Sequence, residues 1–202
     1  MDGLDDIRAD FQIKRPDVWD KLPDIDLYMD QVISFLGRTQ LAPAQSQKLT
    51  AAMVNNYVKE GLLPRSNKKR YDRNHVALLH IFVALKEVMS VTETGRLLNL
   101  YVDDGDVPAR YNLMLDKLGE ALDRALSEIP EHASRDLLVE TALTFALNSY
   151  ASKMAAQCLL ELIDREIAYE AAEKSRQAQG KAESMPDKSV ATKGNDNEGA
   201  KE

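Results

Sequence analysis

The fold of this chain is decided by residues 49–85, LTAAMVNNYVKEGLLPRSNKKRYDRNHVALLHIFVAL. Thr50 is a candidate N-cap, because its hydroxyl can accept a hydrogen bond from a free amide in a first helical turn. Apolar side chains then recur at helical spacing and predict one buried face: Val54, Tyr57, Val58 and Leu62. The opposite face carries small, amide-bearing and cationic side chains: Ala52, Asn55, Asn56 and Lys59.

A tight basic hairpin is expected after this helix. Gly61 can take the left-handed backbone conformation that ends a helix, and Pro64 cannot continue one. The connection RSNKKRY then carries four cations, Arg65, Lys68, Lys69 and Arg70. Asp72 can cap a second helix, whose expected buried residues are Val76, Leu79, Phe82, Val83 and Leu85. This order of elements is typical of a helix-turn-helix protein with a wing.

Two motifs in this stretch point to a family. Residues 57–62 read Tyr-Val-Lys-Glu-Gly-Leu, and Arg70 and Tyr71 close the basic connection. The segments LTAAMVNNYVKEGLLP and KKRYDRNHVALLHIFVALKEVMSVTETGRLL resemble the winged-helix DNA-binding domain of MerR-type bacterial regulators, in which a recognition helix and a wing end in such runs. The N-terminal part, including LPDIDLYMDQVISFL, also resembles an uncharacterised bacterial family, a domain-of-unknown-function family, that carries such a domain. The resemblance covers roughly residues 20–100.

The resemblance implies duplex DNA as the partner. Asn55 and Asn56 would face base edges, since an amide can pair bidentately with adenine. Because the family usually has Arg-Tyr at these two positions, the phosphate contacts are expected from Lys59 and the wing. The wing also lacks the family's usual glycine. The expected DNA-binding residues are Thr50, Ala52, Asn55, Asn56, Lys59, Arg65, Lys68, Lys69, Arg70, Tyr71 and Arg73.

The charge distribution favours the same surface. From Lys48 to Lys86 the chain carries eight cations and two acids, a net charge of +6. The whole chain carries −7, so the remainder carries −13. A basic patch on an acidic protein would direct a polyanion to that one face. The alternative interpretation is a solvated charge cluster without a partner.

The rest of the N-terminal half is expected to support this unit. Residues 1–22 would form an arm that Trp19 anchors on the domain, although an aromatic side chain there could also bind a partner. Residues 23–100 would form the winged helix-turn-helix domain. Its first helix would be capped by Asp26 and run to Gly37, with Met29, Val32, Ile33 and Leu36 on one face. The connection 38–49 is longer than the turn of about 3–4 residues that such motifs usually have.

A short helix within Val91 to Leu100, starting near Thr92, is expected to end the domain. Thr94 and Gly95 stand where the family has an aliphatic and a polar residue, so this helix is expected to be weak. Residues 101–110, YVDDGDVPAR, are expected to form a linker between domains because of their Asp, Gly and Pro content.

The C-terminal half is expected to be helical and to pair with another copy. Residues 111–177 would form a dimerisation or effector region, with one helix to Ile129 and a long one capped by Ser134 and running to about Glu173. Such apolar helices leave an open side, which favours a homodimer over packing within one chain. A small-molecule effector is compatible with this region, but its residues name no ligand. Residues 178–202 would be a disordered tail.

Several other functions find no support in the sequence. The single cysteine, Cys158, excludes an internal disulfide and is expected to be a buried, inert thiol in a reducing cytoplasm. His75 and His80 are spaced too far apart on a helix for a metal pair, so no metal or cofactor is expected. No catalytic signature, signal peptide or membrane-spanning run is present, so the chain is not expected to be an enzyme or a membrane protein.

These observations predict a mainly all-α chain: a winged helix-turn-helix domain, a helical dimerisation region and a disordered tail. The predicted function is a cytoplasmic MerR-like transcriptional regulator that binds duplex DNA as a homodimer. The alternative is a protein-interaction module that keeps the winged-helix fold and does not bind DNA, because a fold does not fix a function.

Overall fold

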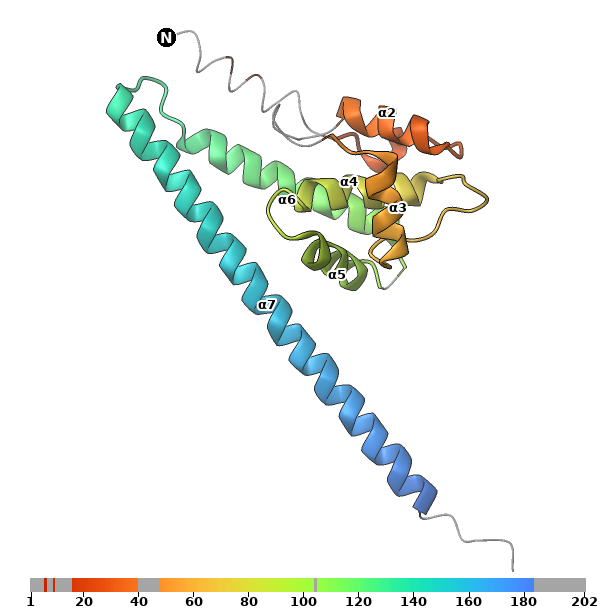
Figure 1. Cartoon of the computed structure of the whole chain (residues 1–202). Coiled ribbons are helices and arrows are strands. Elements are labelled where there is room, and N and C mark those ends of the chain that lie inside the picture. Colours follow the sequence, from red (N-terminus) through yellow and green to blue (C-terminus); the bar gives the residue numbers. More distant parts are fainter. Residues whose placement is uncertain (1–5, 7–8, 10–15, 40–47, 104, 184–202) are drawn as a thin grey trace, which may run out of the picture. The chain divides into compact units, whose positions relative to one another are not determined.

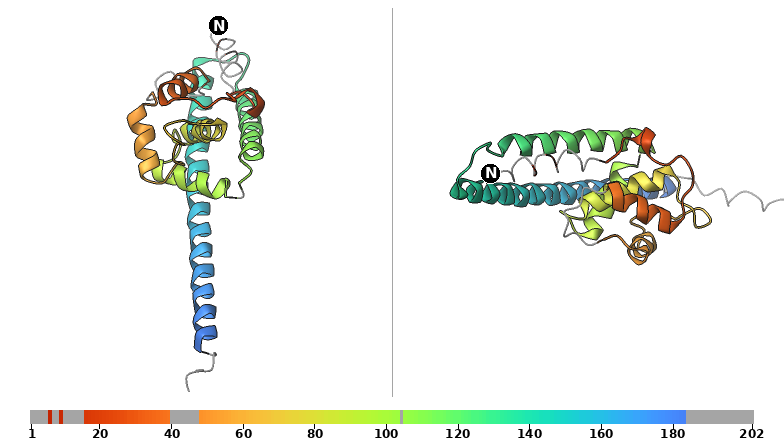
Figure 2. Two further views of the ribbon diagram at one scale, coloured as in Figure 1. Left: turned by 90° about the vertical axis from the view of Figure 1, so that its right-hand side faces the viewer. Right: turned by 90° about the horizontal axis from the view of Figure 1, so that it is seen from above.

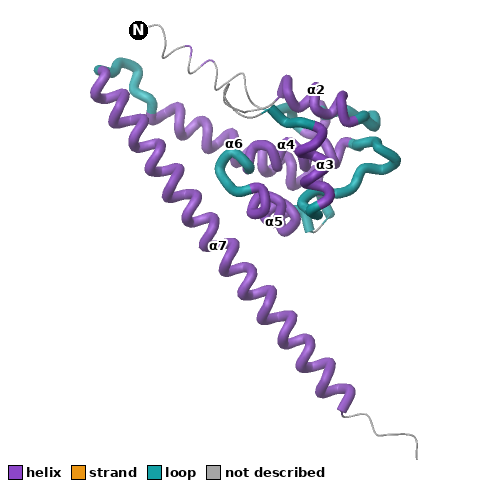
Figure 3. Tube along the Cα trace, viewed as in Figure 1, coloured by secondary structure: helices purple, strands orange, loops and turns teal. Residues whose placement is uncertain are grey.

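The chain is mainly helical over residues 6, 9, 16–39, 48–103 and 105–183, the part that the computed structural model describes (Figure 1, Figure 3). The elements are η1 (Trp19–Lys21), α2 (Met29–Thr39), α3 (Ala51–Lys59), α4 (Arg73–Leu85), α5 (Val91–Tyr101), α6 (Val107–Glu128) and α7 (Arg135–Glu183). The described residues contain two isolated β-bridges and no longer strand. The prediction of a mainly α-helical chain is therefore confirmed. By its contacts the chain divides into two compact units, Met1–Gln157 and Cys158–Glu202.

Helix α4 is the centre of the first unit. Residues 76–83 are buried without interruption, because α2, α5 and α6 all pack against this helix. Asp72 caps it as predicted, with Oδ1 accepting a hydrogen bond of 3.0 Å from the backbone N–H of His75. The ring of Phe82 packs against that of Tyr57 of α3 in a tilted arrangement, with ring centroids 4.6 Å apart. The predicted buried residues are confirmed, except that Leu85 is only half-buried.

Helix α3 begins and ends as the sequence predicts. Thr50 Oγ1 accepts a hydrogen bond of 3.3 Å from the backbone N–H of Met53. After the helix, Gly61 has a φ of 74° and its N–H bonds to the carbonyl of Val58, while the N–H of Leu62 bonds to the carbonyl of Tyr57. This pair of bonds is a Schellman motif, which satisfies the last carbonyls of the helix.

Helix α2 starts later than predicted. It begins at Met29, whereas the sequence predicted a start just after a cap at Asp26. At the observed start, the backbone N–H of Tyr28 donates a hydrogen bond of 2.8 Å to Gln31 Oε1. Val32 and Leu36 are buried in the core, as expected for the face that the sequence indicates. The helix ends at Thr39, and residues 40–47 of the long connection to α3 lie outside the described residues.

Helix α5 has nearly the predicted bounds and is better capped than predicted. Ser90 and Glu93 form a capping box, in which each side chain accepts a hydrogen bond from the other residue's backbone N–H. Thr94 and Gly95, expected to weaken the helix, are both buried in it. Gly95 is needed there, because a Cβ at this position would meet Leu62 at 2.5 Å. Gly95 therefore allows the close packing of α5 on Leu62, just beyond the end of α3.

Residues 101–110, predicted to link two domains, join α5 to α6 within the first unit. Asp106 caps α6 through a bond of 3.1 Å from the backbone N–H of Ala109. Tyr111, in the first turns of α6, is fully buried in the same core as Phe82. Trp19 packs edge-on against Tyr111 at 6.3 Å, and its backbone N–H donates to Asn112 Oδ1 at 3.1 Å. Trp19 is thus anchored on the domain, as predicted, through contacts with α6.

Helix α7 extends further than predicted. Ser134 Oγ caps the helix by accepting a hydrogen bond of 3.2 Å from the backbone N–H of Leu137, and the helix continues to Glu183. Residues 178–183, predicted to be disordered, are therefore helical, since the preceding Ala-, Glu- and Lys-rich sequence favours a helix. Residues 184–202 of the predicted tail lie outside the described residues.

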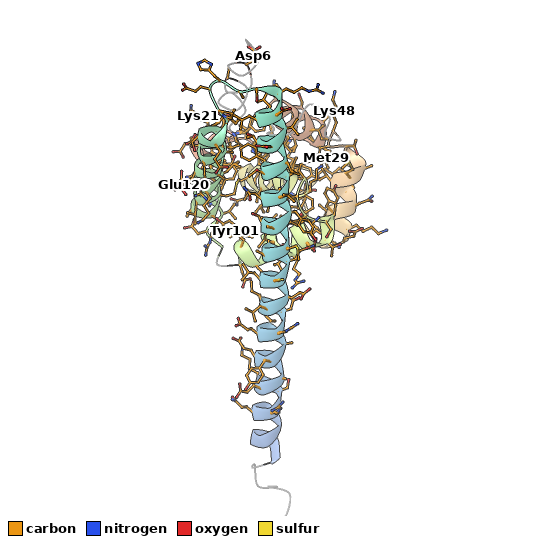
Figure 4. All side chains as sticks on the ribbon, turned by 90° about the vertical axis from the view of Figure 1, so that its left-hand side faces the viewer. Asp6, Lys21, Met29, Lys48, Tyr101 and Glu120 are labelled. Carbon is orange, nitrogen blue, oxygen red and sulfur yellow. The ribbon has the colours of Figure 1, made fainter. Side chains whose placement is uncertain are left out.

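The side chains of α7 point in all directions (Figure 4). Cys158, predicted to be buried, is exposed on this helix. Among the described residues, no helix is both long and apolar enough to cross a membrane.

Candidate nucleic-acid interface

The outer face of α3 exposes the residues that the sequence assigned to it. Val54 and Tyr57 are buried against the core and so fix the rotation of the helix. The exposed side chains on the other side are Ala52, Asn55, Asn56 and Lys59. Thr50 lies at the start of the helix with its hydroxyl oxygen used as the cap. The predicted face is therefore available to a partner, with two amides and one cation.

The end of α3 is held by α5. Asn99 Nδ2 donates a hydrogen bond of 3.3 Å to the carbonyl of Gly61. One turn earlier in α5, Gly95 contacts Leu62 directly. The turn that leads from α3 into the basic connection is thus held by α5 at two points.

The basic connection forms a two-residue hairpin, as the sequence predicts. The N–H of Asn67 bonds to the carbonyl of Arg70 at 3.0 Å, and the reverse bond is 2.8 Å. Lys68 and Lys69 form the loop with φ values of 49° and 65°. Positive φ at both loop residues is the signature of a type I′ turn, which normally favours Asn and Gly. Two exposed cations therefore occupy the tip of a hairpin that projects beyond the helices (Figure 1, Figure 2).

The base of the hairpin is tied to the segment before α2. Leu27 and Tyr71 exchange two backbone hydrogen bonds of 2.9 Å each. The side chain of Tyr71 is only 6% exposed and belongs to the core. The side chain lines a small apolar cavity together with Leu63 and Leu79, so little of it is open to a partner, and its contact with DNA stays a prediction.

The three arginines of this region have different surroundings. Arg65 and Arg70 are both exposed. Arg70 also places its guanidinium 5.0 Å over the ring of Tyr28 and donates a hydrogen bond of 3.1 Å to the Tyr28 hydroxyl. Arg73 is half-buried, with Nε 3.4 Å from the carbonyl of Pro23 and the guanidinium 5.6 Å over the ring of Trp19. Arg73 therefore holds the N-terminal segment on α4, a structural role that the sequence did not indicate.

A histidine that the sequence did not assign to the interface lies between the connection and α4. Nδ1 of His75 lies 2.7 Å from Oδ1 of Asp72, and Nε2 lies 3.1 Å from the carbonyl oxygen of Arg65. Burial alone would raise the pKa of Asp72, but backbone and side-chain hydrogen bonds from His75 outweigh it and lower that pKa. The sequence did carry a signal for this contact, because Asp72 is the cap of α4 and His75 is the third residue of that helix.

A second histidine forms the polar centre of the core. The hydroxyl of Tyr111 donates to the carbonyl of Asp17 at 2.9 Å and lies 3.0 Å from Nδ1 of His80. Because the hydroxyl proton is used at Asp17, Nδ1 of His80 must carry the proton of the neutral ring. Burial lowers the pKa of His80 to about 4, and burial together with Asp17 raises the pKa of Tyr111.

We call the exposed residues of α3 and the hairpin the basic face. It consists of Ala52, Asn55, Asn56, Lys59, Arg65, Lys68, Lys69 and Arg70. Of the predicted DNA-binding residues, Thr50, Tyr71 and Arg73 fall outside it, for the structural reasons given above. Among the described residues, no group of three acidic, histidine or cysteine side chains is arranged to hold a metal ion.

One family model matches part of the first unit. Residues 17–114 match a family described as a domain of unknown function, DUF1836. The match includes Asp17 and Tyr111, which the core hydrogen bond joins, so it extends beyond the domain 23–100 expected from the sequence. No curated protein and no solved structure matches the chain.

Proposed function

We propose that this chain is a MerR-like transcriptional regulator, which binds duplex DNA through the basic face. The observation that carries the proposal is the pairing of an exposed amide-bearing helix with a hairpin that presents Lys68 and Lys69 at its tip. An α-helix fits the major groove, and amides can read base edges there. Lysines at a projecting tip suit the phosphate backbone, which they would contact in any sequence.

The charge distribution supports the same face. Residues 48–86 carry a net charge of +6 and the remainder of the chain carries −13. The acidic remainder would repel DNA, so binding through any other surface is disfavoured. None of the four exposed cations at Lys59, Arg65, Lys68 and Lys69 has a carboxylate partner among the ion pairs between described residues.

We further propose a homodimer formed through α7. Five large apolar side chains lie on one face of α7 and are 47% to 63% exposed: Val139, Leu143, Leu147, Tyr150 and Met154. Soluble proteins rarely leave such a continuous apolar surface open. A dimer would cover it and present two basic faces to the two half-sites of a palindromic operator. We place the protein in the cytoplasm, where such a regulator acts. A small-molecule effector stays compatible with this helix.

The alternative function is a protein-interaction module on the same fold. The observation that favours it is the pair Asn55 and Asn56, which stands where the resembling regulators carry Arg and Tyr. In this case the basic face would be dispensable, and α7 or the Trp19 segment would bind a protein partner. The two functions therefore differ in which substitutions abolish binding.

The test is a selection of bound fragments from random duplex DNA by the purified full-length chain, followed by titration of the enriched sequence across a salt series. A palindromic motif with a steep salt dependence is the expected result. Lys69→Ala should weaken binding to every sequence and reduce the salt slope by about one, because it removes one phosphate contact. Asn55→Ala should instead relax the sequence preference, with an affinity loss of about 1–3 kcal/mol on the best site.

Lys117→Ala provides the matched control for charge. Lys117 is exposed on α6, so its removal changes the net charge equally without touching the basic face. If Lys69→Ala and Lys117→Ala have the same effect, the binding comes from net charge and the basic face is not the site. If no fragment is enriched and binding is weak at low salt, the interaction module is the better proposal.

A further inference from the structure

The ring of His75 joins the basic connection to α4. Nδ1 lies 2.7 Å from Oδ1 of Asp72 at the start of the helix, and Nε2 lies 3.1 Å from the carbonyl oxygen of Arg65 at the start of the connection. The imidazole is 13% exposed, and Tyr71 packs edge-on against it with ring centroids 5.6 Å apart. Both ring nitrogens thus meet oxygen atoms in a mostly enclosed position.

Both of these oxygen atoms can only accept hydrogen bonds. A backbone carbonyl has no proton to give, and an ionised carboxylate is an acceptor only. The lowered pKa of Asp72 keeps its carboxylate ionised near neutral pH. Each contact therefore requires an N–H on the ring, and a neutral imidazole has only one. Only the doubly protonated, cationic ring makes both hydrogen bonds.

We propose that His75, in its cationic form, is a positioning residue that fixes the basic hairpin on the start of α4. The bond to Arg65 holds the point where the chain leaves the α3 turn, and the hairpin tip with Lys68 and Lys69 follows within a few residues. The proposal rests on the proposed function only where it concerns DNA. Its structural part is that a charged ring holds the connection on α4, and this part is inferred from the contacts with Asp72 and Arg65 alone.

The surroundings of His75 explain why the charged ring is accepted. The amino-terminal end of α4 disfavours a cation, but the carboxylate of Asp72 lies in direct contact and offsets this effect. The ring also meets the carbonyl of Arg65 and the phenol ring of Tyr71, and it lines a small cavity with the uncharged side chains of Val54, Val58, Leu63, Pro64 and Leu79. When the ring loses a proton, one nitrogen presents a lone pair to an oxygen, and that contact must break. The charge-assisted contact with Asp72 is the shorter, so the Arg65 contact is the one expected to be lost.

The first experiment detects the protons directly. A nitrogen NMR spectrum of the full-length chain labelled at histidine should show protons on both ring nitrogens of His75 in mildly acidic buffer, and a proton on only one nitrogen of His80. Asp72→Asn keeps a good helix cap but removes the carboxylate charge. It should weaken the signal of the second His75 N–H at the same pH. A single N–H on folded His75 in mildly acidic buffer, or no change in Asp72→Asn, would overturn the proposal.

The second experiment measures the effect on binding to a short random-sequence DNA duplex. Where NMR shows the doubly protonated ring, His75→Gln should bind roughly threefold to tenfold more weakly than the parent chain. The difference should vanish at the higher pH where the second N–H is lost, whereas the control His132→Gln, an exposed residue, should match the parent throughout. An equal defect at every pH would mean that the ring acts only by packing. If the parent chain itself does not bind DNA, the proposed function fails, and the NMR result still decides the role of His75.

Discussion

Gly95 of α5 lies so close to Leu62 that a Cβ atom built on the glycine would be 2.5 Å from the Cβ of the leucine. A Cβ atom cannot move as the tip of a flexible side chain can, so a methyl group here must push α5 and the end of α3 apart. Leu62 directly follows Gly61, in the turn after α3, and it precedes the basic connection. The position of the basic face therefore depends on the absence of a side chain on α5.

Gly95→Ala should destabilise the first unit. Overpacking costs about 1–3 kcal/mol and the gain in helix propensity is about 1 kcal/mol, so we expect a net loss of up to about 2 kcal/mol. Gly37→Ala is the matched control, because Gly37 lies in α2 with nothing within 4 Å of the added Cβ. It should be neutral or stabilising by about 0.5–1 kcal/mol. Urea denaturation of both variants checks this, and equal free energies of unfolding would contradict the close packing.

Replacing Lys68 with Asn and Lys69 with Gly should separate the shape of the hairpin from its charge. Asn-Gly is the favoured sequence for a type I′ turn, so the double variant should be more stable than the parent chain by about 0.5–1 kcal/mol. The double alanine variant removes the same two charges but disfavours the turn. Both variants should weaken DNA binding to a similar extent, as measured by fluorescence anisotropy at low salt. If Asn-Gly binds DNA as well as the parent chain, the tip lysines do not contact it.

Acidification should destabilise the fold through His80. The pKa of this buried ring is lowered from 6.5 to about 4, so below pH 6.5 the unfolded chain takes up a proton that the folded chain refuses. This group therefore does not reduce the free energy of unfolding above pH 6.5, and it reduces that free energy by about 3 kcal/mol in total as the pH falls toward 4. Hydrogen bonds from Ser90 and Gln157 lower the pKa of Glu93 from 4.5 to about 2, so this group adds a loss of stability as the pH falls from about 4.5 to 2.

His80→Gln checks the origin of this pH dependence. The variant should be less stable at neutral pH but should lose less stability between pH 6.5 and 4 than the parent chain. His132→Gln removes an exposed histidine and should keep the full slope. Thermal or urea denaturation at several pH values measures the difference. A parent-like slope in His80→Gln would place the titrating group elsewhere.

Tyr111→Phe should cost more than a similar change at the surface. The hydroxyl of Tyr111 satisfies the carbonyl of Asp17 and Nδ1 of His80, and the phenylalanine would leave both groups without this partner. The expected loss is about 1–3 kcal/mol. Tyr28→Phe removes the exposed hydroxyl that accepts from Arg70, and it should change the stability by less than about 0.5 kcal/mol. Similar losses in the two variants would show that the core hydrogen bonds contribute little.

Charged substitutions on the open face of α7 should abolish the proposed dimer. Leu143→Glu with Leu147→Glu introduces two charges among the exposed apolar side chains, where a second copy would have to desolvate them. Sedimentation velocity should then give a monomer, while Asn148→Glu, an exposed polar position on the same helix, should leave the dimer intact. A parent chain that sediments as a monomer at high concentration would refute the dimer itself.

The local patterns in residues 49–85 were sufficient to predict several elements. The caps at Thr50 and Asp72, the turn at Gly61 and the basic hairpin all depend on interactions between residues close in sequence, and they are confirmed. The composition of residues 101–110 was misleading, because Asp, Gly and Pro mark a turn but do not reveal whether the turn separates two cores. The end of α7 was placed too early, since the polar composition beyond residue 177 hid a strong helix propensity.

The sequence by itself determined the helical class, the exposed amide face of α3 and the concentration of cations in the basic connection, because these follow from periodicity, capping and charge. Only the tertiary structure decided that Tyr71 is buried, that Arg73 holds the Trp19 segment, and that His75 meets two acceptors. It also joined Asp17 to Tyr111 across the core. These relationships depend on how segments far apart in the sequence pack in three dimensions. The pattern within one segment does not identify the segment that packs against it.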